Sequence, residues 1–166
     1  MARNLGETTI TNSLLDRLID LEPGTEMEST LSRAQSIRLL RGAVRRDLEW
    51  LLNTRRNPDI PEDGPQEIHH SVLAWGLPDL SALSMATAAD RSRLTRQVAA
   101  AIALFEPRLA SVRVSLVETS DPSRKDVRMR IQAMLRMDPV PEPVSFDTVL
   151  EVKTGNCRVS GGDDAR

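Results

Sequence analysis

The sequence predicts an α+β fold in which N-terminal helices pack on one face of a C-terminal antiparallel β-meander of three or more strands. Two observations lead to this fold class. Up to Phe105, apolar residues recur every three or four positions, which is the spacing of a buried helix face. After Pro107, apolar and polar residues alternate, which is the spacing of a strand with one buried face. Since each element must bury its apolar side on another, helices followed by strands give a layer of helices on a sheet.

The helical half begins with a short helix expected over Asn12–Leu21, which ends before Pro23 and Gly24. Its small size suggests an element that docks on a partner. Ser32 or a near neighbour caps a longer helix. The apolar residues of that helix form one face: Ile37, Leu40, Val44, Leu48 and Leu51. The proline-rich stretch 57–65 is predicted to be a surface loop.

A second helical region follows this loop. A short helical stretch is expected around Glu67–Ala74, and Gly76 ends it. A long helix then runs from about Asp90 to Phe105. Pro107 ends this helix because it cannot continue the hydrogen-bond ladder and disfavours the helical conformation of the residue before it.

Three strands are expected after Pro107. The first has Val112, Val114 and Leu116 on one face, and a turn at 121–123 separates it from the second. The second strand has one apolar face, made of Val127, Met129, Ile131, Ala133, Leu135 and Met137. Its other face is polar, with Arg128, Arg130, Gln132 and Arg136, which is typical of an antiparallel sheet with one solvated side. The third strand alternates over 144–152.

A chain of 166 residues fits one domain with one core. We expect residues 1–10 to be a flexible N-terminal segment, 11–158 to be the single α+β domain, and 159–166 to be a flexible tail. The N-terminus has no apolar signal-peptide core, and no stretch is long enough to span a bilayer. The single cysteine excludes an internal disulfide, and we expect a cytoplasmic protein.

Composition limits the function classes. The 22 basic and 24 acidic side chains give a formal net charge of −2, so no global field draws in nucleic acid or an anionic membrane. With no tyrosine, two tryptophans and two phenylalanines, the chain offers few flat platforms for sugars, bases or cofactors. The arginines of the second helix are predicted to form a solvated face. We therefore expect a locally recognised protein partner, without nucleic acid, membrane insertion, cofactor or small-molecule substrate.

The sequence gives little support for a metal site or a catalytic nucleophile. His69 and His70 are adjacent, so on a helix they point about 100° apart and cannot easily share a metal. Cys157 lies near the expected flexible end, where little could hold a base against it. We expect no metal site and an inert thiol.

Glu106-Pro107-Arg108 stands at the junction between the long helix and the first strand. In an extended chain Glu106 and Arg108 project to the same side, as a local structural feature or a docking point. Glu106 could also be one acid of a glycosidase pair. Arg108 argues against this role because a nearby cation favours the ionised carboxylate, whereas a general acid must hold its proton. An exposed ion pair adds about 0–1 kcal/mol, so truncating either side chain should leave the thermal midpoint nearly unchanged.

Four stretches in register resemble the TssE family of type VI secretion baseplate wedge components and their relatives in contractile phage tails, which are sometimes labelled lysozyme-like. The stretches are 13–18, 47–55, 71–79 and 105–109, and the resemblance extends over roughly residues 13–152. On this resemblance, Glu106, Pro107 and Arg108 correspond to the family's Glu-Pro-Arg motif, implicated in contacts that allow the sheath to start. Leu51–Arg55 matches a second motif, to which no atomic role is assigned.

The resemblance implies a non-enzymatic structural protein that links the baseplate wedge to the contractile sheath and initiates sheath assembly. The implied partners are wedge proteins of the TssF, TssG and TssK type and sheath proteins of the TssB/TssC type. The meander from Val112 to Val152 would offer an edge to a sheath strand, at Val144–Val152, and the helical half would grip the wedge. The alternative is a peptidoglycan-cleaving lysozyme-like glycosidase. The residues expected to contact partners are Glu106, Pro107, Arg108, Leu15, Leu18 and Arg55.

Overall fold

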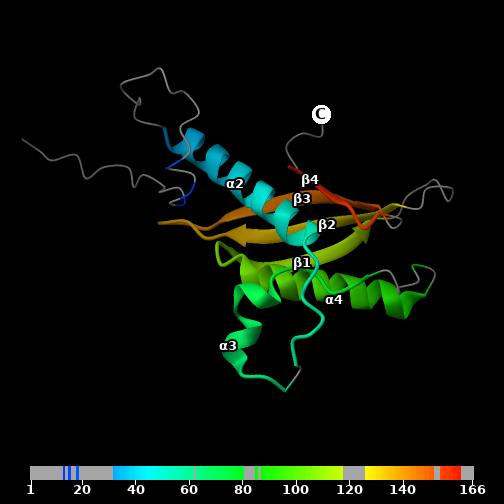
Figure 1. Cartoon of the computed structure of the whole chain (residues 1–166). Coiled ribbons are helices and arrows are strands. Elements are labelled where there is room, and N and C mark those ends of the chain that lie inside the picture. The colour runs from blue at the N-terminus through cyan, green and yellow to red at the C-terminus, as the bar shows by residue number, and fades with distance from the viewer. Residues whose placement is uncertain are drawn as a thin grey trace, which may run out of the picture.

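The computed structural model describes residues 13, 15, 18, 32–61, 63–80, 85, 87–117, 126–151 and 154–161. Helices come first, followed by a sheet (Figure 1), so the expected α+β class is confirmed. The helical elements are α2 (Arg33–Asn53), α3 (Gln66–His69), the 3₁₀ helix η1 (Val72–Ala74) and α4 (Ala88–Phe105). The strands are β1 (Leu109–Val117), β2 (Asp126–Leu135), β3 (Glu142–Glu151) and β4 (Cys157–Gly161).

The helix α2 begins with a capping box at Ser32, as the sequence predicts. The Ser32 hydroxyl oxygen accepts a hydrogen bond from the Gln35 N–H at 3.3 Å, and the Gln35 side-chain oxygen accepts one from the Ser32 N–H at 2.8 Å. These two bonds satisfy donors that a helix start otherwise leaves unpaired. The predicted apolar face is buried at Leu40, Val44, Leu48 and Leu51.

The sheet is fully antiparallel, with the order β1-β2-β3-β4. Alternate residues of β2 and β3 face the helices, and Ile131 lies opposite Phe146 in the buried layer. The other face is polar, and Arg130 lies opposite Asp147 on it. The alternation expected for the second and third strands is therefore confirmed.

Two expectations about the end of the chain are wrong. The sequence predicts that the domain ends at 158, but Val159–Gly161 belong to β4, which pairs with β3 from Cys157 onwards. A strand of five residues with two apolar side chains gives little periodic signal, which is why it was missed. The additional strand also pairs with Phe146–Leu150, so this part of β3 has neighbours on both sides and does not offer the unpaired edge that we expected over 144–152.

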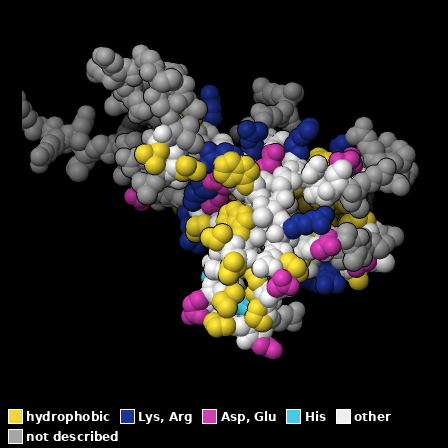
Figure 2. Space-filling model, in the orientation of Figure 1, with side chains coloured by type: hydrophobic (Ala, Val, Ile, Leu, Met, Phe, Trp, Pro, Cys, Tyr) yellow, Lys and Arg dark blue, Asp and Glu magenta, His cyan; other side chains and the backbone are white. Residues whose placement is uncertain are grey.

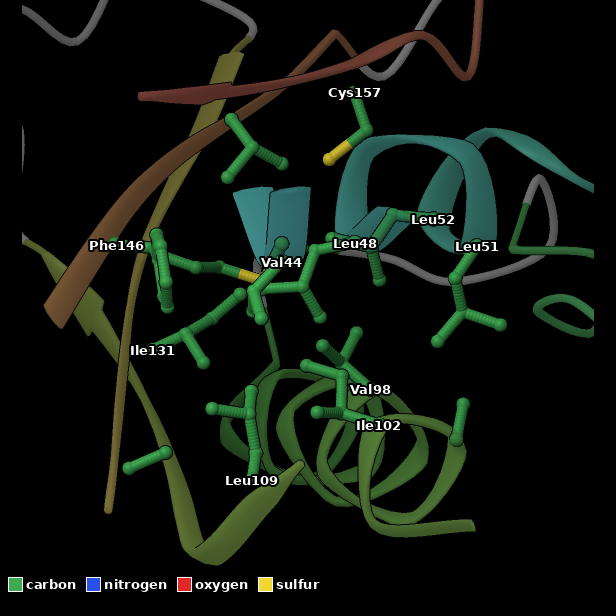
Figure 3. Packing of buried hydrophobic residues seen from close by; sticks show 14 of the residues in the cluster. Val44, Leu48, Leu51, Leu52, Val98, Ile102, Leu109, Ile131, Phe146 and Cys157 are labelled. Atoms are coloured by element: carbon green, nitrogen blue, oxygen red, sulfur yellow. The ribbon is translucent and has the colours of Figure 1, made fainter. Parts of the chain in front are cut away.

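The core lies between the helix layer and one face of the sheet (Figure 3). The helix α2 packs along β4 and α4 packs along β1, so the two long helices together cover the sheet face. Leu48, Leu94, Val98, Ile102 and Ile131 have almost no exposed surface. Burying a side chain of this size contributes about 1.5–3 kcal/mol, so this layer is the main source of stability.

Most of the helix expected over Asn12–Leu21 lies outside the described residues. Of that stretch, Ser13, Leu15 and Leu18 are described, and Leu15 and Leu18 are 51% and 82% exposed. The helices within the described part of the chain are too short or too polar to cross a membrane.

Candidate functional site

Glu106 is the C-cap of α4 and lies directly before Pro107. Its backbone has left the helical region, but its N–H still donates to the Ile102 carbonyl at 2.9 Å. The Leu109 N–H donates to the Glu106 carbonyl at 3.1 Å, so the chain makes one turn before β1 begins. Glu106 and Arg108 therefore meet across a turn rather than along an extended strand.

The Glu106 carboxylate is enclosed by Arg108. Its Oε1 accepts hydrogen bonds from Arg108 Nε at 2.6 Å and from the Arg108 backbone N–H at 3.2 Å, and its Oε2 accepts one from Arg108 Nη2. Arg108 Nη2 also donates to Asp47 Oδ2 at 2.6 Å, which ties the junction to α2. One guanidinium thus bridges two carboxylates from separate elements.

The expectation of an exposed ion pair is wrong. Glu106 is 4% exposed, and the Arg108 side chain retains 25% of its surface. The hydrogen bond from Arg108 to Glu106 raises the pKa of Arg108 above its usual value, against the opposing effect of desolvation, and Asp47 adds to the increase. Removing one member of a desolvated pair leaves the other charge poorly compensated, so truncation here must affect folding.

The charged network continues along α2 to an exposed tryptophan. Asp47 Oδ1 accepts a hydrogen bond from Arg46 Nε at 2.9 Å and forms an ion pair with Arg46 Nη2 at 2.8 Å. The Arg46 guanidinium lies 5.2 Å from the centre of the Trp50 ring. Trp50 is 56% exposed. Hydrophobic, basic and acidic side chains lie side by side on the face shown in Figure 2. The network thus runs from a buried glutamate to an aromatic side chain at the surface, a residue type enriched in protein interfaces.

The role of Asp47 in this site is not among the sequence-based expectations. Asp47 is 61 positions before Arg108, so no local pattern joins them. The available signal was that Asp47 is the first residue of the second stretch that carries the family resemblance.

This geometry does not suit a general acid. Both carboxylate oxygens of Glu106 already accept hydrogen bonds from Arg108, and the side chain is nearly inaccessible. A glycosidase acid must be protonated and must reach the glycosidic oxygen in a cleft. Glu106 is also absent from the lining of the cavity described below.

The Leu51–Arg55 motif now has an atomic role, which is to join α2 to the rest of the fold. Leu51 and Leu52 are core residues. The Asn53 side chain forms two hydrogen bonds with the backbone of Cys157, as a neighbouring strand would. Its oxygen accepts a hydrogen bond from the Cys157 N–H at 2.7 Å, and its nitrogen donates one to the Cys157 carbonyl at 2.7 Å. The end of α2 is thereby pinned to the outer edge of β4.

Gly76 allows the 54–56 and 76–78 segments to approach closely. The Leu77 N–H donates to the Thr54 carbonyl at 2.9 Å, and the Arg56 N–H donates to the Leu77 carbonyl at 2.8 Å. Gly76 has φ +109°, and a Cβ there would lie 2.8 Å from the Thr54 carbonyl carbon. Glycine meets both the conformational and the spatial demand.

The remaining candidate residues form no side-chain bonds with the Glu106 network. Arg55 is exposed at the end of α2, and Pro107 is exposed at the junction. His69 contacts Arg56, with 3.4 Å between Nδ1 and Nη2. Among the described residues, no group of three potential ligands could hold a metal ion.

Cys157 is buried in β4, not placed near a loose end. Burial raises the pKa of its thiol to about 12, and the negative charge of Glu49 adds to this effect. The thiol is therefore protonated at neutral pH, which makes it a poor nucleophile.

The two edges of the sheet differ. On β4, the Cys157 N–H and carbonyl are bonded to Asn53, and the Val159 N–H donates to Glu49 Oε2 at 3.4 Å, so α2 side chains occupy much of that edge. On β1, no backbone group of Arg113–Val117 bonds to any described segment other than β2. Within the described chain, β1 is the open edge.

Two comparisons with known proteins bear on these features. A family model described as "Baseplate wedge protein gp25" matches residues 38–140, which is more than half of the chain. The matched region contains Asp47, Arg55, Glu106 and Arg108. Comparison with curated proteins gives no match.

Proposed function

We propose that this chain, which belongs to the gp25 family of baseplate wedge proteins, links the wedge to the contractile sheath of a type VI secretion system and initiates sheath assembly. Membership of the family makes it a structural baseplate component and confirms the family expected from the sequence. The observation that carries the sheath part of the proposal is the open β1 edge, which begins directly after the Glu106–Arg108 junction.

The β1 edge suits the addition of a partner strand. The register between β1 and β2 shifts between Ala110 and Arg113, and Ser111 has φ 53°, so a bulge interrupts the start of the edge. Arg113–Val117 is the regular part, without proline or lysine, which commonly protect strand edges. Backbone hydrogen bonds along these residues would supply affinity, and alternate side chains would set the register.

The Glu106 network fixes where this edge begins. The Arg108 carbonyl accepts a hydrogen bond from the Arg136 N–H at 2.7 Å, so Arg108 lies at the end of the β1–β2 ladder. Its side chain is held by Glu106 from α4 and by Asp47 from α2. A strand start anchored to both helices is ordered before the partner arrives, which reduces the entropic cost of binding. In this proposal Glu106 and Arg108 position the edge, and the exposed Pro107 contacts the partner.

The helical side is proposed to face the wedge. Leu15, Leu18 and Trp50 are large apolar side chains that are each more than half exposed. They would contact wedge proteins of the TssF, TssG or TssK type, while β1 would receive sheath proteins of the TssB/TssC type. The proposed location is the cytoplasm, and the proposed role is not enzymatic.

Hydrogen–deuterium exchange on adding purified sheath protein tests this proposal. We expect slower exchange at Arg113–Val117 and little change at Phe146–Leu150 of β3, because those residues are already paired on both sides. In a Cys157→Ala background, a cysteine introduced by Ser115→Cys should crosslink to sheath protein, whereas Val149→Cys, which lies between β2 and β4, is the matched control. Unchanged exchange in β1, or cleavage of cell-wall glycan by the purified protein, would refute the proposal.

A further inference from the structure

A cavity of about 130 Å³ lies between the end of α2, the segment 77–80 and the turn that joins β3 to β4. Its apolar lining includes four buried or nearly buried core residues: Leu52, Leu77, Leu94 and Leu150. An apolar cavity of about 150 Å³ can hold a benzene-sized molecule, so this one has room for a single aliphatic side chain. The bonds of Asn53 to β4 and the close approach at Gly76 hold its walls in place.

Arg55 lies at the rim of this cavity and has unused binding groups. It forms a parallel bridge with Leu77. The two hydrogen bonds of this bridge run from the Leu77 N–H to the Thr54 carbonyl and from the Arg56 N–H to the Leu77 carbonyl. In this pattern the N–H and carbonyl of Arg55 itself point away from Leu77. Within the described chain, neither these groups nor the guanidinium takes part in a hydrogen bond or an ion pair.

The Arg55 guanidinium therefore has no ion-pair partner among the described residues. A Cβ on Gly155 would lie 3.9 Å from Arg55 Nη2, which places the guanidinium over the β3–β4 turn. Asp79 also lines the cavity, but it is engaged in another interaction. An exposed arginine beside a cavity with an apolar wall can bind a carboxylate while the cavity takes up an apolar side chain.

We propose that this cavity is a docking site for an extended segment of a partner protein, with one aliphatic side chain in the cavity and a carboxylate on Arg55. The N–H and carbonyl of Arg55 would form two backbone hydrogen bonds with that segment. Side chains on one face of an extended chain are two residues apart, so the aliphatic and acidic residues are separated by one residue. This site is distinct from the β1 edge and does not depend on the sheath being the partner.

NMR titration of the ¹⁵N-labelled full chain tests this inference. The probes are acetyl-Gly-Leu-Ser-Asp-Gly-amide and a second peptide in which the core is reversed to Asp-Ser-Leu. Two peptides are used because a partner segment could bind in either chain direction. We expect saturable shifts at the amides of Arg55, Leu77 and Gly155 with a dissociation constant on the order of 1 mM for one of the two peptides. Peptides with Lys in place of Asp, or Ala in place of Leu, should bind at least tenfold more weakly.

Matched variants separate recognition from general surface charge. Arg55→Glu should weaken the acidic peptide at least tenfold and reverse the preference towards the Lys peptide. Arg45→Glu removes an exposed arginine within α2, about 12 Å before the end of the helix, and should change nothing. Absence of saturable shifts at these amides for both peptide orders, or equal binding of Asp and Lys peptides, would overturn the proposal. Unchanged amide spectra of each variant away from its substituted residue show that the variant is folded.

Discussion

Replacing Glu106 by glutamine tests whether the Glu106–Arg108 couple belongs to the core or to the surface. The substitution keeps the size of the side chain and one oxygen, but it removes the charge that faces Arg108. In the native chain, that carboxylate accepts three hydrogen bonds from Arg108 while being 4% exposed. Arg108 would be left with Asp47 as its remaining charged partner.

The expected loss follows from the burial of the two groups. Removing one member of a buried ion pair costs about 3–5 kcal/mol. Arg108 keeps Asp47 and 25% of its side-chain surface, so water and a second carboxylate compensate part of this cost. We therefore expect Glu106→Gln to lower the free energy of unfolding by about 2 kcal/mol. For a chain of this size, that corresponds to a fall in Tm of about 4–8 °C.

A double-mutant cycle with Arg108→Met, measured by urea unfolding, isolates the coupling. Arg108→Met should cost more than Glu106→Gln, because it leaves the more buried charge without its partner. The double variant should cost less than the sum of the two single variants by about 1 kcal/mol or more. The exposed Arg130–Asp147 pair is the matched control, and Asp147→Asn should change stability much less.

Two other outcomes would show that the Glu106–Arg108 couple does not stabilise the fold. If Glu106→Gln changes the unfolding free energy no more than Asp147→Asn does, the couple behaves as a solvated pair. If the two single variants are additive, Arg108 does not depend on Glu106. Either outcome would refute the argument that this network anchors the start of β1.

Three further predictions follow from the contacts of α2, Gly76 and Cys157. Asn53→Ala removes both side-chain bonds to the β4 edge, so we expect the free energy of unfolding in urea to fall by about 1–3 kcal/mol and amide exchange at Cys157 to become faster. Unchanged exchange at Cys157 would contradict the proposal that Asn53 holds the end of α2 on β4. Gly76→Ala places a methyl group against Thr54 at φ +109°, so in thermal melts we expect the free energy of unfolding to fall by about 3 kcal/mol or more, or the chain not to fold. Gly42→Ala on α2 is the tolerated control, because its Cβ would meet nothing within 4 Å. The pKa of the Cys157 thiol is raised to about 12, so the folded state holds this proton at pH values where the unfolded state has lost it, and stability falls as pH rises above about 9. With two lysines and no tyrosine, few other groups titrate in this range. Between pH 8 and pH 10 the free energy of unfolding should therefore fall by about 1.4 kcal/mol more for the native chain than for Cys157→Ala. Parallel pH profiles of the two proteins would contradict the burial of the thiol.

The sequence by itself determined the elements that depend on near neighbours. The Ser32 cap, the apolar face of α2 and the end of α4 before Pro107 all follow from side chains within one helical turn of each other. The alternation along β2 and β3 likewise fixed which side chains face the helices. Local conformation and period are properties of a short stretch of chain, so a single sequence contains them.

Only the tertiary structure decided which edge is open, which charges are buried and how the motifs act. The strand β4 converts β3 from an edge to an interior strand, and the α2 side chains Glu49 and Asn53 then occupy the new edge. Asp47 reaches Arg108 across 61 positions, and packing of the helices on the sheet is what desolvates Glu106. These features depend on which elements lie beside one another, and that choice is made by burial of the whole apolar surface rather than by any local pattern.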